Sequence, residues 1–240
     1  MDKRVLLISN STMHGSGFLD HCMPEIVDFL GNRRKIAFIP FALFSRKEYA
    51  EKASKRLAAA GYSVTAIFEP SHARQIVAEA EAIFVGGGNT FRLLKTMYDF
   101  DVLSAIAARV KKDGIPYIGS SAGSIVAGPT IKTTKDMPIV QPPSFDALQL
   151  VPFQISPHFL DPDPNSTHMG ETQEDRILQF LEENDAPVAG LREGAMLRVE
   201  NGSVVLKGPT GARIFRKGKP PQEAKHGDSL GSLLAAGAEK

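Results

Sequence analysis

The sequence predicts an α/β fold with a mostly parallel sheet and helices on both faces of that sheet. Short, uninterrupted apolar runs alternate with segments of helical period over most of the chain. Strands that are buried on both faces have such continuous apolar runs, and their alternation with helices indicates a parallel sheet. The 240 residues fit one α/β unit. We therefore expect a single domain over residues 1–240.

Five apolar runs are predicted as the strands of this sheet, at 5–8, 36–39, 64–68, 82–85 and 116–118. Helices are predicted between and after them, at 18–30, 45–60, 71–80, 90–97, 101–112 and 172–183. The helix at 45–60 has the clearest boundaries, because Ser45 and Glu48 match a capping box and Gly61 is a typical C-terminal stop.

The C-terminal part is predicted to add a β-hairpin. Asn201-Gly202 lies between two apolar runs, at 196–199 and 204–206, and Asn-Gly is a strong signal for a two-residue hairpin turn. Short strands are also expected at 188–190 and 212–215. From about residue 217 the chain is polar and rich in Gly and Ala, so we expect a loosely ordered tail over 217–240.

The charge balance argues against nucleic acid as a partner. Lys and Arg number 28 against 27 Asp and Glu, for a net charge of +1, so no basic excess indicates nucleic-acid binding. The chain has one cysteine, Cys22, and its apolar N-terminal run is short, which favours a cytoplasmic protein without a membrane segment. The sequence leaves the oligomeric state open, a homodimer included.

The strongest chemical signal is the segment Gly119-Ser120-Ser121-Ala122-Gly123. It follows an apolar strand and precedes a run compatible with a helix, which is the setting of a G-x-S-x-G nucleophile elbow. Among the neighbouring serines, only Ser121 has glycine two residues before and two residues after it. The alternative is a Gly/Ser turn that binds an anion or only connects two elements.

A second glycine-rich loop, Gly86-Gly87-Gly88, ends the neighbouring predicted strand. Consecutive glycines let a ligand approach the backbone closely, so the amides of Gly88 and Ala122 are candidate donors to an oxyanion. A phosphate-binding loop is the rival interpretation, but neither G-x-G-x-x-G nor a following Gly-Lys-Ser/Thr is present. A purely structural turn also remains open.

A nucleophilic serine needs a base, and His158 is the leading candidate among six histidines because it follows a strand-like stretch. The base in turn needs an orienting carboxylate. Glu193 and Asp136 both qualify, and residue-level reasoning leaves the two open. No His or Cys spacing typical of a metal site occurs, so we expect neither a metal nor a cofactor.

The sequence resembles the peptidase E family of α-aspartyl dipeptidases over nearly its whole length. The stretches that carry the resemblance are 7–12, 38–42, 85–91, 117–123, 133–140, 145–148, 157–159, 170–172 and 208–210. The resemblance implies a fold similar to class I glutamine amidotransferases (flavodoxin-like). It also implies a cytoplasmic serine exopeptidase that removes N-terminal Asp from dipeptides through an acyl-enzyme.

Matched motif by motif, the family's site residues fall on this chain as follows. Ser121 would be the nucleophile, His158 the base and Glu193 its partner, with Asp136 as the alternate third member. Gly88 and Ala122 would form the oxyanion hole. Asn89, Thr90, Gln173 and Arg176 are expected to contact the peptide.

One position departs from the family pattern. Gln173 stands where the family commonly has an Arg that pairs with the substrate's Asp side chain, and an amide lacks the charge of that group. Arg176, one helical turn further on, is a candidate substitute. Two alternatives therefore stay open: a serine hydrolase of altered specificity, for other short peptides or a cyanophycin-like polymer, and a non-catalytic module that binds an anion or nucleotide.

Overall fold

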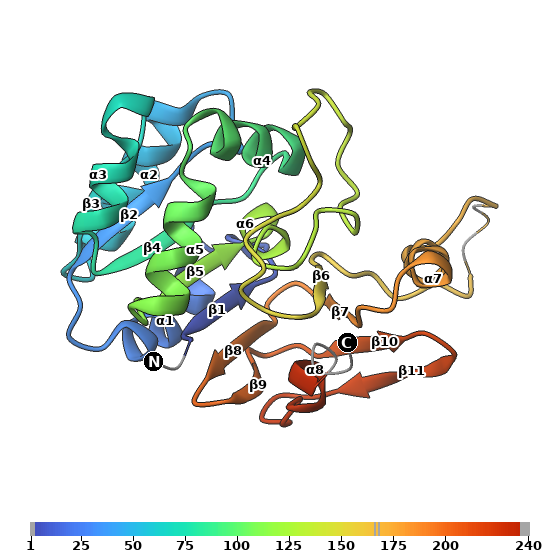
Figure 1. The fold of residues 1–240 in the computed structure, drawn as a ribbon. Coiled ribbons are helices and arrows are strands. Elements are labelled where there is room, and N and C mark those ends of the chain that lie inside the picture. Colours follow the sequence, from blue (N-terminus) through green and yellow to red (C-terminus); the bar gives the residue numbers. More distant parts are fainter. Residues whose placement is uncertain (1–2, 166, 168, 236–240) are drawn as a thin grey trace.

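The computed structural model describes residues 3–165, 167 and 169–235 (Figure 1). Its main sheet has seven strands in the order β3-β2-β4-β5-β1-β8-β9. The five parallel strands are β1 (Val5–Ile8), β2 (Lys35–Ile39), β3 (Ser63–Ala66), β4 (Ala82–Val85) and β5 (Tyr117–Ser120). The predicted hairpin forms β8 (Met196–Glu200) and β9 (Ser203–Lys207), which join the edge next to β1 in antiparallel fashion.

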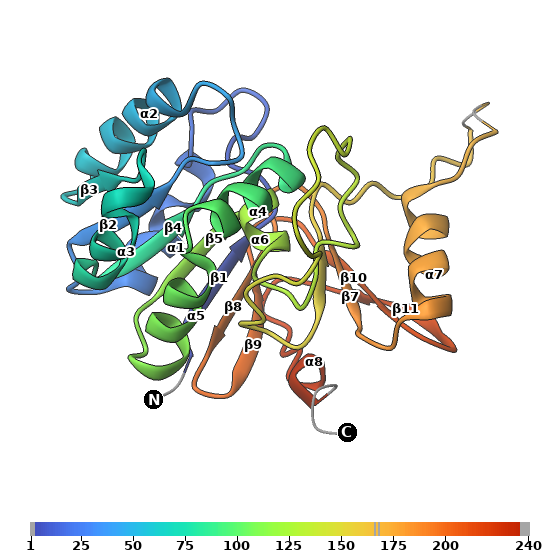
Figure 2. The ribbon, with the colours of Figure 1, turned by 45° about the horizontal axis from the view of Figure 1, so that its top comes forward.

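Helices cover both faces of the main sheet (Figure 2). A short 3-10 turn (Asp20–Cys22), α1 (Met23–Leu30) and α2 (Arg46–Ala58) share one apolar cluster with one face. Helices α3 (Pro70–Glu79), α4 (Thr90–Asp99) and α5 (Leu103–Lys112) share another cluster with the opposite face. The predicted fold class, a mostly parallel sheet between two helical layers, is confirmed.

A second sheet lies beside the first and was not predicted as a separate unit (Figure 1). Its order is β11-β10-β7-β6, with strands β6 (Gln154–Ser156), β7 (Val188–Leu191), β10 (Ala212–Arg216) and β11 (Lys219–Ala224). Helix α7 (Gln173–Glu183) packs on this sheet through a small apolar cluster formed by Phe159, Ile177, Leu181, Val188 and Phe215.

Two local predictions are wrong. The Ser45 side chain makes no capping hydrogen bond, because its backbone (φ −80°, ψ 67°) lies outside the extended conformation that an N-cap usually adopts. A capping box forms instead at the start of α7, between Thr172 and Asp175. The segment from residue 217, expected to be loose, contains β11 and a short helix, α8 (Ser232–Ala235), while residues 236–240 lie outside the described part.

Strand β11 escaped prediction because it contains Pro220 and Pro221. Proline is tolerated on an edge strand, where its missing N–H faces away from the ladder, and β11 is the edge next to β10. Within the described residues, no helix is both long enough and apolar enough to cross a bilayer.

Candidate active site

Ser121 stands at a strained turn between β5 and α6 (Ala122–Ile125), with φ 53° and ψ −113°. The flanking glycines make this turn sterically possible. A Cβ on Gly119 would lie 2.4 Å from the Gly123 carbonyl oxygen, and a Cβ on Gly123 would lie 2.1 Å from the Val85 carbonyl oxygen. Because no side chain fits at these contacts, the elbow packs directly against β4 and presents Ser121 at the carboxyl edge of the sheet.

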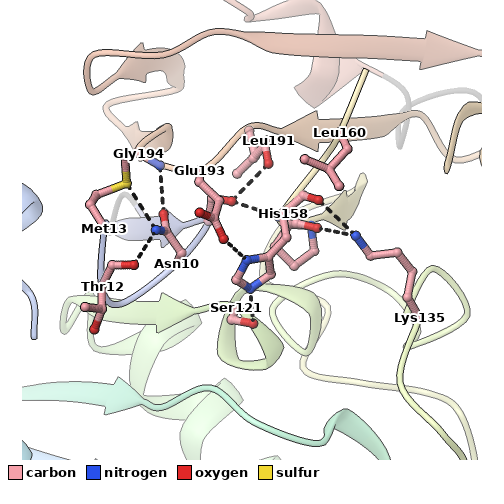
Figure 3. Close-up of polar contacts among 12 residues, drawn as sticks. Asn10, Thr12, Met13, Ser121, Lys135, His158, Leu160, Leu191, Glu193 and Gly194 are labelled. Atoms are coloured by element: carbon pink, nitrogen blue, oxygen red, sulfur yellow. Dashed lines mark hydrogen bonds and ion pairs between the residues drawn. The ribbon is translucent and has the colours of Figure 1, made fainter. Parts of the chain in front are cut away.

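Three side chains from distant segments form one hydrogen-bonded chain (Figure 3). Ser121 Oγ lies 2.9 Å from His158 Nε2, and His158 Nδ1 lies 2.7 Å from Glu193 Oε1. Both distances are within the range expected between a nucleophile, its base and an orienting carboxylate. The side chains of His158 and Glu193 are 41% and 49% exposed, so the group is open to solvent and to a substrate.

Ser9 and Asn10, which directly follow β1, hold the two loops that carry His158 and Glu193. Ser9 Oγ accepts a hydrogen bond from His158 N (2.9 Å) and donates one to the Leu191 carbonyl (2.9 Å). Asn10 Oδ1 accepts one from Gly194 N (2.7 Å), as Figure 3 shows. Sequence reasoning gave these residues no role. Their position after a buried parallel strand, at the edge where ligands bind, was the available signal.

Lys135 holds the His158 segment from the other side (Figure 3). Its ammonium donates to the carbonyl oxygens of Pro157 (2.9 Å) and His158 (3.1 Å). Burial lowers the pKa of Lys135 to about 8, and the attraction of Asp136 only partly opposes this effect. The lysine was not predicted to have a role.

The glycine loop after β4 packs against Ser121. A Cβ on Gly87 would lie 2.9 Å from the Ser121 Cβ, so only glycine allows this approach. The Gly87 amide donates to the buried Tyr49 hydroxyl at 2.9 Å, and burial raises the pKa of Tyr49 to about 12. Within the described part of the chain, the amides of Gly88 and Ala122 donate to no protein acceptor, so both are available to a ligand.

Asp136, the alternate partner of the base, pairs with other groups. Its Oδ2 accepts hydrogen bonds from the Thr90 amide (2.7 Å) and the Thr90 hydroxyl (2.6 Å), and it lies 3.1 Å from the Thr134 hydroxyl. The ring of His158 bonds Glu193 instead. Geometry therefore separates two carboxylates that the sequence could not.

A cavity of about 590 Å³ opens onto Ser121. Its lining includes side chains from several elements: Ser11, Phe18, Leu43, Ser45, Glu48, Tyr49, Lys52, Ser121, Asp136 and His158, with the backbone of Gly87 and Gly88. The cavity places the glycine loop and the Ser121–His158 pair in one wall.

The four residues expected to contact the peptide make other contacts. Asn89 caps α4 by accepting from Arg92 N at 3.0 Å, and Thr90 is buried against Asp136. Gln173 Oε1 accepts from the Leu160 amide at 3.1 Å. Gln173 and Arg176 line a separate cavity of about 80 Å³, beside Lys135.

Fold and site together define a class of protein. An α/β sheet presents a serine on an elbow to a histidine–carboxylate pair, with two unpaired amides beside it, and this is the arrangement of a serine hydrolase.

Comparison with known proteins defines the family. The model of Peptidase family S51 matches residues 5–207. A relative named "Peptidase E" from Streptomyces coelicolor is 50% identical over 96% of this chain and 94% of its own length. One from Nostoc sp., also "Peptidase E", is 46% identical over 98% of both chains. A Drosophila melanogaster relative, "Probable alpha-aspartyl dipeptidase", is 42% identical over 89% of this chain and 90% of its own. The chain belongs to peptidase family S51, and the non-catalytic alternative is not favoured.

Solved structures agree on the fold. A crystal structure of a peptidase from an acI-B1 Actinobacterium has a TM-score of 0.70 at 17% identity, covering 96% of this chain and 97% of its own. A candidate peptidase E protein from Listeria monocytogenes has a TM-score of 0.68 at 23% identity, covering 88% of this chain and all of its own.

Proposed function

We propose that this protein is a serine dipeptidase that cleaves the bond after the N-terminal residue of dipeptides, with Asp as the first residue. The observation that carries the proposal is the hydrogen-bonded chain from Ser121 through His158 to Glu193, set beside two unpaired amides. Membership in family S51 and a relative named "Probable alpha-aspartyl dipeptidase" support the same substrate class.

The reaction follows from the positions of these groups. His158 Nε2 takes the proton of Ser121 Oγ as the serine attacks the carbonyl carbon of the N-terminal residue. Glu193 accepts a hydrogen bond from the Nδ1–H of His158, which fixes the tautomer with a free Nε2 and stabilises the imidazolium without protonating the carboxylate. The amides of Gly88 and Ala122 bind the oxyanion, where a single donor contributes about 3 kcal/mol. The protonated His158 then delivers its proton to the leaving amine, and water releases the acyl group.

The decisive experiment is turnover of Asp-Leu by wild type and by the Ser121→Ala variant. We expect the variant to keep its unfolding midpoint and to lose turnover by at least about 1,000-fold, because the nucleophile is missing. A fluorophosphonate probe should label wild type and leave the variant unlabelled. Undiminished turnover in the variant would refute the assignment of Ser121.

Altered first-residue specificity is the second candidate, and Gln173 favours it. Its amide oxygen bonds the Leu160 amide, and it carries no charge to pair with an acidic side chain. A panel of dipeptides that differ only in the first residue separates the aspartyl dipeptidase from a hydrolase of altered specificity. It is run on wild type and on Gln173→Arg. A wild-type preference for Asp over Asn supports the aspartyl dipeptidase, whereas a preference that appears only in Gln173→Arg supports altered specificity.

A finer proposal concerns location. A cytoplasmic location fits the single cysteine, which is buried, and fractionation of cells that express a tagged chain would test it. The sequence leaves the oligomeric state open, a homodimer included, and light scattering of the purified protein would decide it.

A further inference from the structure

The Asp136 carboxylate forms no ion pair with any side chain of the described residues. Within the described residues, no Lys, Arg or His nitrogen lies within 4.0 Å of it. The adjacent Lys135 directs its ammonium to two backbone carbonyls. Asp136 also lines the cavity that contains Ser121. A half-buried carboxylate without a cation, in the wall of a substrate cavity, is suited to a cationic group of the ligand.

This carboxylate is fixed in place before any ligand binds. Its Oδ2 accepts hydrogen bonds from three groups: the Thr90 amide, the Thr90 hydroxyl and the Thr134 hydroxyl. Its Oδ1 accepts none from any described residue. One oxygen is therefore held as an anchor while the other remains free to accept. A fixed acceptor binds more tightly than a mobile one, because no rotamer entropy is lost on binding.

Asp136 is tied to the same loop that supplies an oxyanion donor. Thr90, its double hydrogen-bond partner, comes two residues after Gly88 and begins α4. In a dipeptide, the α-nitrogen lies about 2.5 Å from the carbon of the scissile carbonyl, two covalent bonds away. A carbonyl bound at the Gly88 and Ala122 amides thus brings its own α-ammonium close to this loop.

We infer that Asp136 Oδ1 binds the free α-ammonium of the substrate, and so restricts the enzyme to peptides with an unblocked N-terminus. This inference rests on the proposed function and adds a binding residue to it. It also explains why a carboxylate belongs at position 136 although His158 is oriented by Glu193.

Two other carboxylates near the cavity are less suited. Glu193 already forms a hydrogen bond with His158. Glu48 lines the cavity from α2, but it is exposed and makes no hydrogen bond with any described residue, so binding would have to immobilise it. A metal ion would need further ligands, and no group of three or more His, Cys, Asp or Glu side chains among the described residues could supply them.

The test measures binding in a Ser121→Ala background, where substrate stays intact. Titration calorimetry compares Asp-Leu with N-acetyl-Asp-Leu for four proteins: the background alone, and the background with Asp136→Asn, with Glu48→Gln or with Glu51→Gln. The asparagine can still accept from Thr90, and it then presents an amide donor where Oδ1 stood. Glu51→Gln, an exposed carboxylate of the same helix as Glu48 that does not line the cavity, is the matched control.

We expect Asp136→Asn to weaken Asp-Leu roughly 30-fold, the scale of one charge-assisted hydrogen bond, and to leave N-acetyl-Asp-Leu unchanged. Glu51→Gln should keep the background's preference for the free amine. Equal weakening of both ligands, no weakening of either, or loss of the preference in Glu48→Gln would overturn the inference. If Asp136→Asn fails to fold, Thr134→Val takes its place. We then expect the preference for Asp-Leu over N-acetyl-Asp-Leu to fall about threefold.

Failure of the inference and failure of the proposed function remain distinguishable. Wild type that turns over Asp-Leu while Asp136→Asn keeps its preference for the free amine would overturn only the role of Asp136. Wild type without peptide turnover would overturn the proposed function itself.

Discussion

The two sheets contribute to the site in different ways. The main sheet supplies Ser121, Gly88 and Ala122 from turns whose geometry follows from backbone sterics within a few residues. The loops of the second sheet supply His158 and Glu193, which side-chain hydrogen bonds from Ser9, Asn10 and Lys135 hold in place. The first half of the site is thus built by excluded volume, and the second by a polar network that crosses between sheets.

This difference predicts different responses to substitution. A side chain added at a glycine of the main-sheet half meets backbone that cannot move, so it should damage fold and activity together. A change in the network should leave the fold largely intact and misplace the base, which lowers kcat more than it raises KM.

The largest effect is expected for Gly123→Ala. The new Cβ would meet the Val85 carbonyl oxygen at 2.1 Å, so the elbow must shift away from β4. We expect a loss of about 3 kcal/mol or more in the free energy of unfolding and no measurable turnover. Urea denaturation and Asp-Leu hydrolysis measure the two. Gly231→Ala is the control, because its Cβ would meet nothing within 4 Å, and near-wild-type stability of Gly123→Ala would contradict a sterically built elbow.

An intermediate effect is expected for Ser9→Ala, which removes the hydroxyl between the two sheets. It leaves the His158 amide without its partner, while the Leu191 carbonyl keeps its hydrogen bond from the Phe159 amide, at a cost of about 1–3 kcal/mol in the free energy of unfolding. We expect kcat to fall roughly tenfold with KM little changed.

Ser124→Ala is the matched control for Ser9→Ala. Ser124 is also buried, but among the described residues its hydroxyl bonds only the carbonyls of Ile8 and Gly119, both within the main sheet. It should therefore lower stability with a much smaller change in kcat. Equal kcat for the two variants would argue against the network. A single unfolding transition in these experiments would also support the one-domain prediction.

The smallest effect is expected for Lys135→Met, and it depends on pH. The folded-state pKa of about 8 lies below the ordinary lysine value, so between pH 8 and about 10.5 the unfolded chain keeps a proton that the folded chain has lost. The free energy of unfolding of wild type should therefore rise with pH across this window.

The substitution should remove that rise. The surrounding protein desolvates the Lys135 ammonium, yet the residue as a whole is exposed, so solvent screening should keep the effect below about 1 kcal/mol. Thermal melts between pH 7 and 10 would measure it, with the exposed Lys132→Met as control. An unchanged slope in Lys135→Met would assign the pH dependence to other groups.

Much of the fold could be predicted because its signals are local. The runs 5–8 and 82–85 are apolar throughout and match β1 and β4 in full, and Asn201-Gly202 places the β8–β9 hairpin. The second sheet carries weak signals. Strand β6 has three residues, and β11 contains two prolines, so their pairing depends on neighbours that are distant in the sequence.

The site residues also differ in whether their signal is local in the sequence. The sequence selected Ser121 because the glycine spacing around it has one steric interpretation. Residue-level reasoning named Glu193 and Asp136 without ranking them, and only the family resemblance put Glu193 first. Nothing within a few residues of either carboxylate states its distance from His158. Ser9 carried only its position after a buried strand as a signal, and Lys135 carried none, because their contacts with the His158 segment join residues that are distant in the sequence.

By itself, then, the sequence determined the α/β layers, the elbow and the glycine loop, since each follows from hydrophobic period or from clashes between near neighbours in the chain. The tertiary structure alone decided that Glu193 meets the imidazole while Asp136 turns to Thr90 and the cavity. The physical reason is the sequence separation of the interacting groups. Steric clashes act between residues that are adjacent in the sequence. The hydrogen-bond partner of a charged side chain, in contrast, is whichever group the tertiary packing places within about 3 Å of it.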